Sequence, residues 1–436
     1  MQRLKIAIFQ DTYHPTMNGV VVSTDLFVRG LRARGHEVML VVPRYPNDDV
    51  EHDKNAVYIP AIKTDFIYPE SCLGKFWKRK TVLEALQEFA PDIIHSMTEF
   101  TIGHWMSSYY QKKLGCKRVH TFHTLWTEYL FYVPVPQFIS QRWLRWAAEG
   151  AVRKRADAVI APTSKFREIL IDDWGIKSVP VDVVPTGIDL AKFKTTVGER
   201  FRDLHGIEED EKVILYLGRM GDEKNVELVI ESMAELRKRN VDKLRFVIAG
   251  GGPEGYMKKL KKLANSLKLD DIIWTGFITG QNWLDCYGAA NITFFPSITE
   301  TQGLVVIESL AAGVPLVSVR AIGPASTMAG EKGCLWAEAT PQDFADKTIR
   351  MLNDDVLYER KKQEALEVAS AYSMEQRAEE LEGVYYRTLG LAEKDDDESQ
   401  SVDENSEHFM NNRTDDQKTE ASNTSKIILP NTKVAV

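Results

Sequence analysis

The stretch "ITFFPSITETQGLVVIESLAAG", residues 292–313, contains a short apolar run, a polar loop and an amphipathic segment in direct succession. The apolar run predicts a buried strand that ends at Pro296, so residues 297–302 form the loop at its carboxyl end. Gly303 then opens a helix. Two acids, Glu300 and Glu308, lie in the loop and in the helix. A buried strand followed at once by a helix is the unit of a parallel α/β sheet.

The same pattern repeats in two long stretches of the chain, and this predicts an α/β protein with two doubly wound, Rossmann-like parallel sheets. Ligands of such sheets bind at the carboxyl ends of the strands. Two such edges facing each other would make a central cleft. The expected strands are residues 4–9, 37–42, 92–96, 118–122, 157–162 and 181–185 in the first sheet, and 213–218, 244–250, 272–276, 292–296 and 315–319 in the second.

Punctuation and composition divide the chain into four parts. The Pro and Gly of "PTGIDLAKFKTT" (185–196) indicate a join between a first domain, 1–190, and a second domain, 191–372. The helical stretch 373–390 is expected to pack back toward the first domain. Residues 391–436 carry 11 acidic and 5 basic side chains, which is most of the net charge of −8. This acidic tail is expected to be disordered and to hold no catalytic residue.

Composition limits the class of protein. The chain has 436 residues, of which 44% are apolar, enough for large cores. No apolar run approaches the roughly 18–20 residues that cross a bilayer, and the first residues do not resemble a signal peptide, so we expect a cytoplasmic protein. The four cysteines show no metal-ligand spacing, and nothing indicates nucleic-acid binding. The oligomeric state is not predictable from these features.

The loop and helix after residue 296 have the groups that would hold a nucleotide sugar. Free amides at the helix start favour an anion, and Thr301 adds a hydroxyl donor. A carboxylate accepts two hydroxyl donors at once, so Glu300 and Glu308 could each grip a sugar diol. Taken alone, the simpler alternative is as good: an acid before a helix favours its dipole, and Glu308 is then a surface residue.

Two cations follow the first strand of the second domain. Arg219 comes directly after that strand, and Lys224 lies near the start of the next helix. An arginine fork and a lysine point charge suit a diphosphate. On local grounds alone, ion pairs with Asp222 and Glu223 are the more probable role; the edge shared with Glu300 favours the diphosphate.

The first domain offers a glycine and a histidine at strand ends. Gly19 lies at a helix start directly after the first strand, where a backbone without Cβ can approach a phosphate or a sugar. His123 follows another strand and precedes Glu128, Tyr129 and Tyr132. It would polarise a sugar hydroxyl, although a structural role is commoner for a single histidine.

One glycine pattern points elsewhere and is discounted. "AGGGPEG" satisfies the dinucleotide fingerprint through Gly250, Gly252 and Gly255. That fingerprint also requires an acid at the end of the next strand to bind a ribose, but here this strand ends in Trp274, Thr275 and Gly276. The glycines are therefore expected to form a tight turn near the donor, with Gly252 in the donor site.

These residues together resemble the retaining glycosyltransferases of family 4, whose fold is the two-domain GT-B arrangement. The resemblance runs from about Lys5 to Leu389. It is strongest to the bacterial enzymes that transfer glucose from UDP-glucose to diacylglycerol. The matching segments are the E-x7-E element of Glu300 and Glu308, the "GR…EKN" element of Arg219, Glu223, Lys224 and Asn225, "PTGID" (185–189), "DTYHPTMNGVVVST" (11–24), "FHTLWTEYLFYVP" (122–134) and "SITETQGLVVIESLAAGVPLV" (297–317).

The resemblance implies a role for each matched residue. Arg219 and Lys224 would bind the diphosphate, Glu308 the ribose diol and Glu300 the transferred hexose. His123 would touch the sugar and Gly19 would lie under the diphosphate. The expected catalytic residues are Glu300, His123, Arg219 and Lys224, and the expected donor-binding residues are Gly19, Arg219, Lys224, Gly252, Glu300, Thr301, Gln302, Gly303, Leu304 and Glu308.

No cofactor is expected, because fixed cations and helix amides can stabilise a departing diphosphate without a metal. No D-x-D sequence lies at a predicted strand end; residues 395–397 belong to the tail.

A lipid acceptor requires contact with a membrane. The segment "GKFWKRKTV" (74–82) would suit an anionic interface, which places the protein peripherally on the inner face of the cell membrane. A second basic segment, "FISQRWLRWAAEGAVRKRADAV" (138–159), has the same potential, and a solvated basic helix face is as good an explanation of either. The expected contact residues are Lys75, Phe76, Trp77, Lys78, Arg79 and Lys80.

Other functions stay open at this point. The same chemistry could act on a phosphoinositide, a polyprenyl-linked sugar or a soluble sugar, with a UDP- or GDP-sugar as donor. Two alternatives from other classes are a dinucleotide-dependent dehydrogenase, which the missing ribose acid disfavours, and a non-catalytic protein that binds sugar nucleotides.

Overall fold

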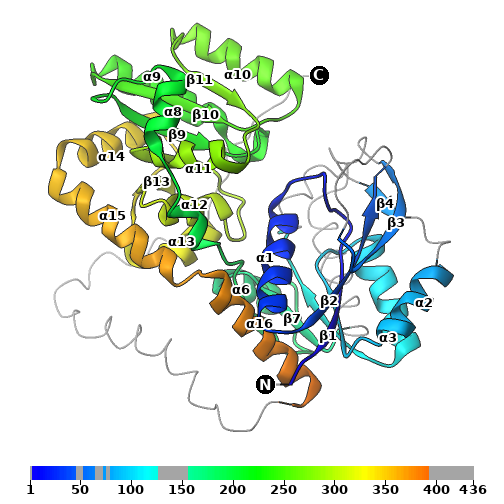
Figure 1. Cartoon of the computed structure of the whole chain (residues 1–436). Helices are drawn as coiled ribbons and strands as arrows, with labels where there is room; N and C mark the ends of the chain where they lie inside the picture. Colours follow the sequence, from blue (N-terminus) through cyan, green and yellow to red (C-terminus); the bar gives the residue numbers. More distant parts are fainter. Residues whose placement is uncertain (1, 46–52, 64–71, 75–78, 126–155, 392–436) are drawn as a thin grey trace, which may run out of the picture. The chain divides into compact units, whose positions relative to one another are not determined.

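The structure is a computed structural model that describes residues 2–45, 53–63, 72–74, 79–125 and 156–391 (Figure 1). The described residues up to Gly390 form one compact unit. The strands among them form two sheets, one of eight strands and one of six. No helix in the described part of the chain is long and apolar enough to span a membrane.

The first sheet has the order β4-β3-β2-β1-β5-β6-β7-β8 and is parallel except where β3 meets β4. Each predicted strand of this sheet is present, but β3 and β4 lay outside the prediction. Pro60 interrupts the apolar run of β3, which is a feature of strands near a sheet edge. The strands are β1 (Lys5–Phe9), β2 (Glu37–Arg44), β3 (Ala56–Lys63), β4 (Cys72–Gly74), β5 (Ile93–Ser96), β6 (Lys117–Thr121), β7 (Ala158–Ala161) and β8 (Val181–Val183).

The second sheet is parallel throughout, with the order β11-β10-β9-β12-β13-β14. All five predicted strands are present, and the short edge strand β14 was missed. The two sheets with their helices confirm the predicted fold class. The strands are β9 (Lys212–Leu217), β10 (Leu244–Ala249), β11 (Ile273–Gly276), β12 (Ile292–Phe295), β13 (Leu316–Val319) and β14 (Cys334–Ala337).

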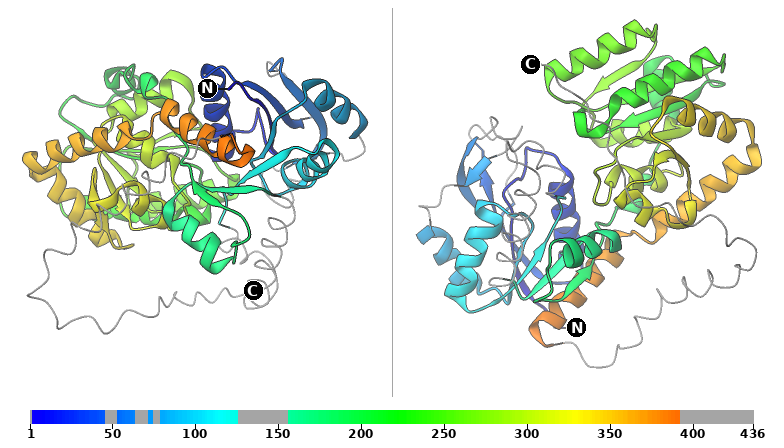
Figure 2. Two further views of the ribbon diagram at one scale, coloured as in Figure 1. Left: turned by 90° about the horizontal axis from the view of Figure 1, so that it is seen from below. Right: turned by 180° about the vertical axis from the view of Figure 1, so that it is seen from behind.

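Helices cover both faces of each sheet (Figures 1 and 2). In the first sheet they are α1 (Gly19–Ala33), α2 (Arg79–Phe89), the π-helix η2 (Thr101–Met106), α3 (Ser107–Leu114), α6 (Ser164–Glu168) and the π-helix η4 (Ile169–Asp173), joined by α16 (Met374–Leu389). In the second they are α8 (Gly198–His205), the 3-10 helix η5 (Asp222–Lys224), α9 (Val226–Lys238), α10 (Glu254–Ser266), α11 (Gly280–Ala289), α12 (Leu304–Ala311), α13 (Ile322–Thr327), the 3-10 helix η6 (Ala329–Glu331), α14 (Pro341–Asn353) and α15 (Asp355–Ser370), with α7 (Leu190–Phe193) in the connection.

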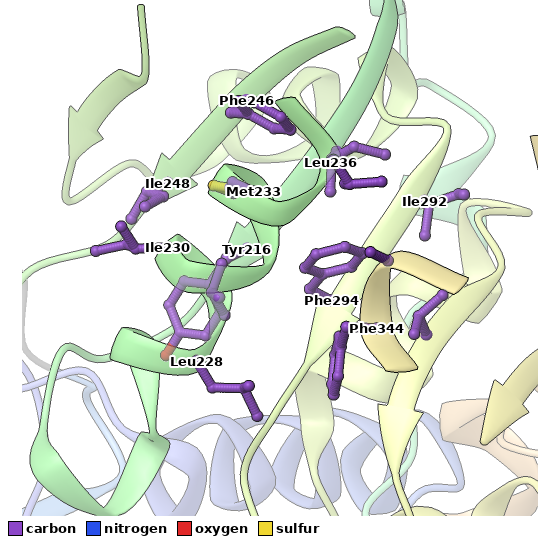
Figure 3. Close-up of a cluster of buried hydrophobic side chains, with 14 of the residues drawn as sticks. Tyr216, Leu228, Ile230, Met233, Leu236, Phe246, Ile248, Ile292, Phe294 and Phe344 are labelled. Carbon is purple, nitrogen blue, oxygen red and sulfur yellow. The ribbon is translucent and has the colours of Figure 1, made fainter. Parts of the chain in front are cut away.

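Alternate residues of the strands of the second sheet enter separate cores, because successive side chains of a strand point to opposite faces. On β9, Ile214 and Tyr216 lie in one core and Val213 and Leu215 in the other. Figure 3 shows the first of these cores, where α9 contributes Met233 and other apolar side chains between the strands and α14. Burial on both faces explains the near-continuous apolar runs from which these strands were predicted.

The helix α16 returns the chain to the first sheet, where it packs on α1 (Figures 1 and 2). Glu382 is the centre of this contact. Its carboxylate accepts hydrogen bonds from Arg34 Nε at 2.8 Å and from Tyr386 OH at 3.0 Å, and it lies 2.8 Å from His36 Nε2. The side chain of Glu382 is 3% exposed. These donors hold its pKa below the usual range, although burial alone would raise it.

The substitution Glu382→Ala should lower the free energy of unfolding by about 3 kcal/mol, because it leaves the Arg34 charge near the interior without its main partner. Urea unfolding followed by tryptophan fluorescence measures this change. Glu379→Ala is the matched control, since Glu379 lies 3.5 Å from the same guanidinium but is 59% exposed. Its cost should stay within about 0.5 kcal/mol. Equal costs for the two variants would contradict this account.

Candidate active site

The loop that was singled out in the sequence lies at the carboxyl end of β12. Gly303 connects it to α12 with φ +81° and ψ 78°, in the left-handed region that favours glycine. A Cβ at this position would lie 3.3 Å from both Phe295 and Val306, closer than most side chains allow. The glycine therefore makes the sharp entry into α12 possible, and the free amides of the first turn lie next to the loop.

Lys224 and Glu300 are brought together from two neighbouring strand ends. Lys224 ends the short helix η5 after β9, and its Nζ forms an ion pair with Glu300 Oε1. Ser297 Oγ lies 3.4 Å from that same carboxylate oxygen and also 3.4 Å from the carbonyl oxygen of Glu223. The two side chains are 22% and 21% exposed, so a solvent-borne anion can still reach them. The sequence prediction that they share one edge is therefore met.

Arg219 forms a local ion pair, which the sequence alone indicated as the more probable role of this residue. Its guanidinium pairs with the carboxylate of Glu223, four residues along the chain. A diphosphate bound here would have to compete with Glu223 for Arg219 and with Glu300 for Lys224. The two cations are thus held at this strand edge by carboxylates.

Glu308 lies in α12, apart from this ion pair. Its Oε2 accepts a hydrogen bond of 2.8 Å from Tyr287 OH of α11. Burial raises the pKa of Glu308 to about 7, although its hydrogen bonds from Tyr287 and Trp283 act in the opposite direction. The residue as a whole keeps some solvent exposure, so it is not sealed in the core. Because Glu308 is largely buried and accepts a hydrogen bond from Tyr287, it is not the solvated surface acid of the simpler alternative.

His123 approaches the loop from the first sheet. Its backbone oxygen accepts a hydrogen bond of 2.9 Å from Thr301 Oγ1, and the carbonyl of Thr301 accepts one of 3.0 Å from Thr163 Oγ1. Burial lowers the pKa of His123 to about 4, so the imidazole is neutral at pH 7. Its Nε2 is enclosed and has no hydrogen-bond partner among the described residues. A buried nitrogen of this kind is suited to a ligand hydroxyl.

Gly19 also lies beside the loop. It is the first residue of α1, and the side chain of the preceding Asn18 accepts hydrogen bonds from the amides of Val20 and Val21 at 3.1 and 3.0 Å. A Cβ built on Gly19 would lie 3.7 Å from Leu304 Cδ1. Two predicted residues from different sheets are therefore adjacent.

Gly252 has a packing role. A Cβ at this position would lie 2.2 Å from the carbonyl oxygen of Met220, and one at Gly250 would lie 1.9 Å from that of Gly218. The glycines thus let the turns after β9 and β10 pack closely together. Close packing of these turns therefore accounts for glycine at positions 250 and 252, whereas a Cβ at Gly255 would meet nothing within 4 Å.

Several partners of the predicted residues were not predicted from the sequence. Thr163 and Thr186 follow strands of the first sheet, and both bond to the loop of the second. Ser297 and Tyr287 contact the two glutamates. A single serine or tyrosine shows no spacing pattern from which its role could be predicted. Thr163, however, directly follows a predicted strand, and this position could have indicated a contact at the strand end. Glu128, Tyr129, Tyr132, residues 75–78 and most of the second basic segment lie outside the described residues.

The substitution Glu308→Gln should stabilise the protein at pH 8 and leave its stability unchanged at pH 4.5. A raised pKa in the folded state means that this group's contribution to stability is fully present below the unfolded pKa and is lost as the pH rises through about 7. The gain at pH 8 should be about 3 kcal/mol, measured by urea unfolding at both pH values. A gain of equal size at both pH values would show that the carboxyl group does not titrate as described.

Comparison with protein families gives two matches that together span most of the chain. The model "Glycosyltransferase Family 4" matches residues 17–192, and "Glycosyl transferases group 1" matches residues 198–368. The first region contains Gly19 and His123. The second contains Arg219, Lys224, Glu300 and Glu308.

Among similar proteins are two alpha-monoglucosyldiacylglycerol synthases. That of Streptococcus pneumoniae is 32% identical over 321 residues, which are 72% of this chain and 71% of that protein. That of Acholeplasma laidlawii is 29% identical over 334 residues, 72% of this chain and 80% of that protein. A D-inositol 3-phosphate glycosyltransferase of Nocardioides sp. is 28% identical over 314 residues, 68% of this chain and 67% of that protein.

Solved structures share the fold at low sequence identity. The structure of Anabaena Alr3699/HepE in complex with UDP and glucose has a TM-score of 0.70 and 16% identity, covering 88% of this chain and all of that one. Sucrose-phosphate synthase from Thermosynechococcus elongatus has a TM-score of 0.70 and 21% identity, covering 89% of this chain and all of that one. With the relatives above, these likenesses establish the class of enzyme: the chain belongs to the family 4 glycosyltransferases and has the GT-B fold.

Proposed function

We propose that this glycosyltransferase transfers glucose from UDP-glucose to 1,2-diacylglycerol with retention of configuration, giving an α-glycosyl glycolipid. The pairing of Lys224 with Glu300 beside the amides of α12 carries the proposal for a nucleotide-sugar donor. The similarity to the two monoglucosyldiacylglycerol synthases supports the acceptor. In this assignment residues 191–372 bind the donor, and residues 1–190 bind the acceptor.

The diphosphate of the donor would exchange places with the carboxylates at the end of β9. Arg219 and Lys224 would then contact phosphate oxygens, and the amides of residues 301–304 would add hydrogen bonds. Charge grows on the diphosphate as the bond to the sugar breaks, so cations already fixed at this edge lower the barrier. The carboxylate of Glu300, released from Lys224, would accept hydroxyl hydrogen bonds from the hexose.

Glu308 and His123 would hold the two ends of the donor sugar nucleotide. Glu308 must be ionised to accept both hydroxyls of a ribose, and its pKa of about 7 means that this state is half populated near neutral pH. Donor affinity should therefore weaken as the pH falls below 7. The neutral imidazole of His123 would use its unpartnered Nε2 toward a hydroxyl of the transferred sugar.

Retention follows if the leaving phosphate acts as the base. The bond between the anomeric carbon and the phosphate oxygen breaks, and the acceptor oxygen bonds to the same face of that carbon. The acceptor proton passes to the departing phosphate, so that no protein base is required. We propose that this reaction needs no metal ion, because Arg219 and Lys224 would supply the neutralising charge.

Two alternative functions can be distinguished from this proposal by experiment. The similarity to the D-inositol 3-phosphate glycosyltransferase favours the same chemistry on a different acceptor. A protein that binds sugar nucleotides without turnover is the alternative from another class.

The decisive experiment incubates the purified enzyme with a panel of UDP- and GDP-sugars and of lipid, inositol phosphate and sugar acceptors, with and without EDTA. Product mass and the anomeric NMR coupling should identify an α-glucosyl diacylglycerol, formed equally well in EDTA. Strict loss of activity in EDTA would contradict metal independence, and a different glycosylated product would reassign the acceptor.

Glu300→Gln serves as the variant in that experiment. It should still bind UDP but lose at least about 100-fold in turnover, because a neutral amide with one acceptor oxygen replaces the charged carboxylate that would bind the hexose hydroxyls. The control Glu254→Gln removes an acid that is 83% exposed and paired with Lys258, and it should not change turnover. Normal turnover by Glu300→Gln would place the chemistry elsewhere.

A diacylglycerol acceptor also requires binding at a membrane surface. Of the basic residues proposed for this contact, Lys80 lies in α2 with a side chain that is 91% exposed, while residues 75–78 lie outside the described residues. Replacing Lys75, Lys78, Arg79 and Lys80 by Glu should abolish sedimentation with anionic vesicles, because each surface cation contributes about 1 kcal/mol. Unchanged sedimentation would exclude this segment as the contact.

A further inference from the structure

Each of three consecutive loop residues bonds to a different partner. Glu300 pairs with Lys224, and both residues follow strands of the second sheet. Thr301 bonds to the carbonyl of His123, after β6. Gln302 bonds to Thr186, after β8, with both atoms of its side-chain amide. With the bond from Thr163, after β7, to the carbonyl of Thr301, the loop is attached to three strand ends of the first sheet immediately after the residue expected to hold the sugar.

The contact between Gln302 and Thr186 is reciprocal. Gln302 Oε1 accepts a hydrogen bond of 2.9 Å from the amide of Thr186, and Gln302 Nε2 donates one of 2.9 Å to the carbonyl of Thr186. A side-chain amide carries one acceptor and one donor group, so it can satisfy both backbone groups of a residue as a neighbouring strand would. The residue types fit: an acid, a leucine or a lysine at position 302 could not make both bonds at neutral pH.

This pair lies in the interior. Gln302 is 4% and Thr186 is 3% exposed, so neither backbone group of Thr186 could turn to water instead. Thr186 Oγ1 also donates a hydrogen bond of 2.9 Å to Ser23 Oγ, a fully buried residue of α1. The pair therefore continues into the helix that begins at Gly19.

The backbone of Gln302 is held from its other side as well. A Cβ at Gly323 would lie 2.6 Å from the amide nitrogen of Gln302, so the two backbones are in close contact. The amide of Gly323 donates a hydrogen bond of 2.9 Å to the carbonyl of Glu300. The loop is thus held between α13 on one side and Thr186 on the other.

We propose that Gln302 is a positioning residue for sugar transfer: its amide fixes the loop that carries Glu300 against Thr186, where the chain leaves the first sheet. Gln302 need not touch the donor for this role. It sets where the carboxylate of Glu300 and the amides of α12 lie relative to Gly19 and His123. The inference rests on the proposed function, because it assumes that these groups hold the donor.

Three variants test the role of the amide. Gln302→Leu keeps a similar volume but removes both hydrogen bonds, and Gln302→Glu keeps the shape and one acceptor. Gln281→Leu is the control, because the amide of Gln281 also donates to a backbone carbonyl, that of Thr195 at 3.0 Å, but in a different part of the second sheet. The measurements are kcat for transfer, the Kd of UDP by calorimetry and the thermal midpoint.

Gln302→Leu should lower kcat by about 10- to 100-fold, because a displacement of the reacting groups on the order of 1 Å costs that much. The Kd of UDP should change by less than about threefold, because Arg219, Lys224 and Glu308 have partners other than Gln302 and keep their places in the variant. Gln281→Leu should change neither quantity. A folded Gln302→Leu enzyme with wild-type kcat, or with kcat and UDP affinity reduced by the same factor, would overturn the inference.

Gln302→Glu gives a second readout that does not depend on how well the leucine variant folds. A carboxyl group buried at this position has a raised pKa, and in its protonated form it reproduces both hydrogen bonds of the amide. The ratio of its kcat to that of the wild type should therefore rise as the pH falls from 8 to 6. Taking the ratio cancels the titration of Glu308. A ratio independent of pH would contradict a hydrogen-bonding role.

Hydrogen exchange tests the coupling directly. Saturating UDP should slow amide exchange in a peptide covering residues 181–190 of the wild type, and this protection should be lost in Gln302→Leu. UDP binding without any change in that peptide would reject the inference while leaving the proposed function standing. Failure of the wild type to bind UDP would overturn the proposed function and this inference together.

Discussion

The ion pair of Lys224 and Glu300 depends on a constraint that parallel sheets impose. Neighbouring parallel strands end at the same edge, so residues 76 positions apart in the sequence meet when β9 and β12 pair side by side. Opposite charges at that edge stabilise each other in the ligand-free protein. In the proposed function the same charges would face an incoming diphosphate sugar, with one cation and one hydrogen-bond acceptor at the same strand edge. The geometry of the loop, of Gly303 and of α12 serves to keep this pair at the strand end.

Much of the fold follows from the apolar runs, because strands buried on both faces must be apolar almost throughout. For this reason the apolar runs around Ile6, Val41 and Ile248 were sufficient to predict strands β1, β2 and β10. The strand β3 was missed since Pro60 interrupts its apolar run, and the strands β4 and β14 are too short to show any period. Short edge strands are fixed by the neighbour to which they pair, and this information is not local.

The candidate site was predictable where a residue type has one chemical use at a strand end. Glu300, Lys224 and Gly303 fall in this group, and the structure gives each of them a definite partner or conformation. The shifted pKa values of Glu308 and His123 were not predictable, because they arise from burial by residues distant in sequence. Gln302 was expected only as part of a donor loop. Its contact with Thr186 forms only when both sheets are in place, so no spacing pattern in the sequence could predict it.

The position of α16 has a consequence for how the protein is made. Leu381, Val384 and Tyr385 complete the same core as Ile6 and Val21, and the hydroxyl of Tyr385 lies 2.7 Å from Nδ1 of the buried His95. During synthesis these late residues leave the ribosome long after the strands that they cover. Part of the apolar surface of the amino-terminal half therefore stays uncovered until α16 has been translated. A chain truncated before Leu381 would have a first sheet without the apolar face of α16 that covers this core.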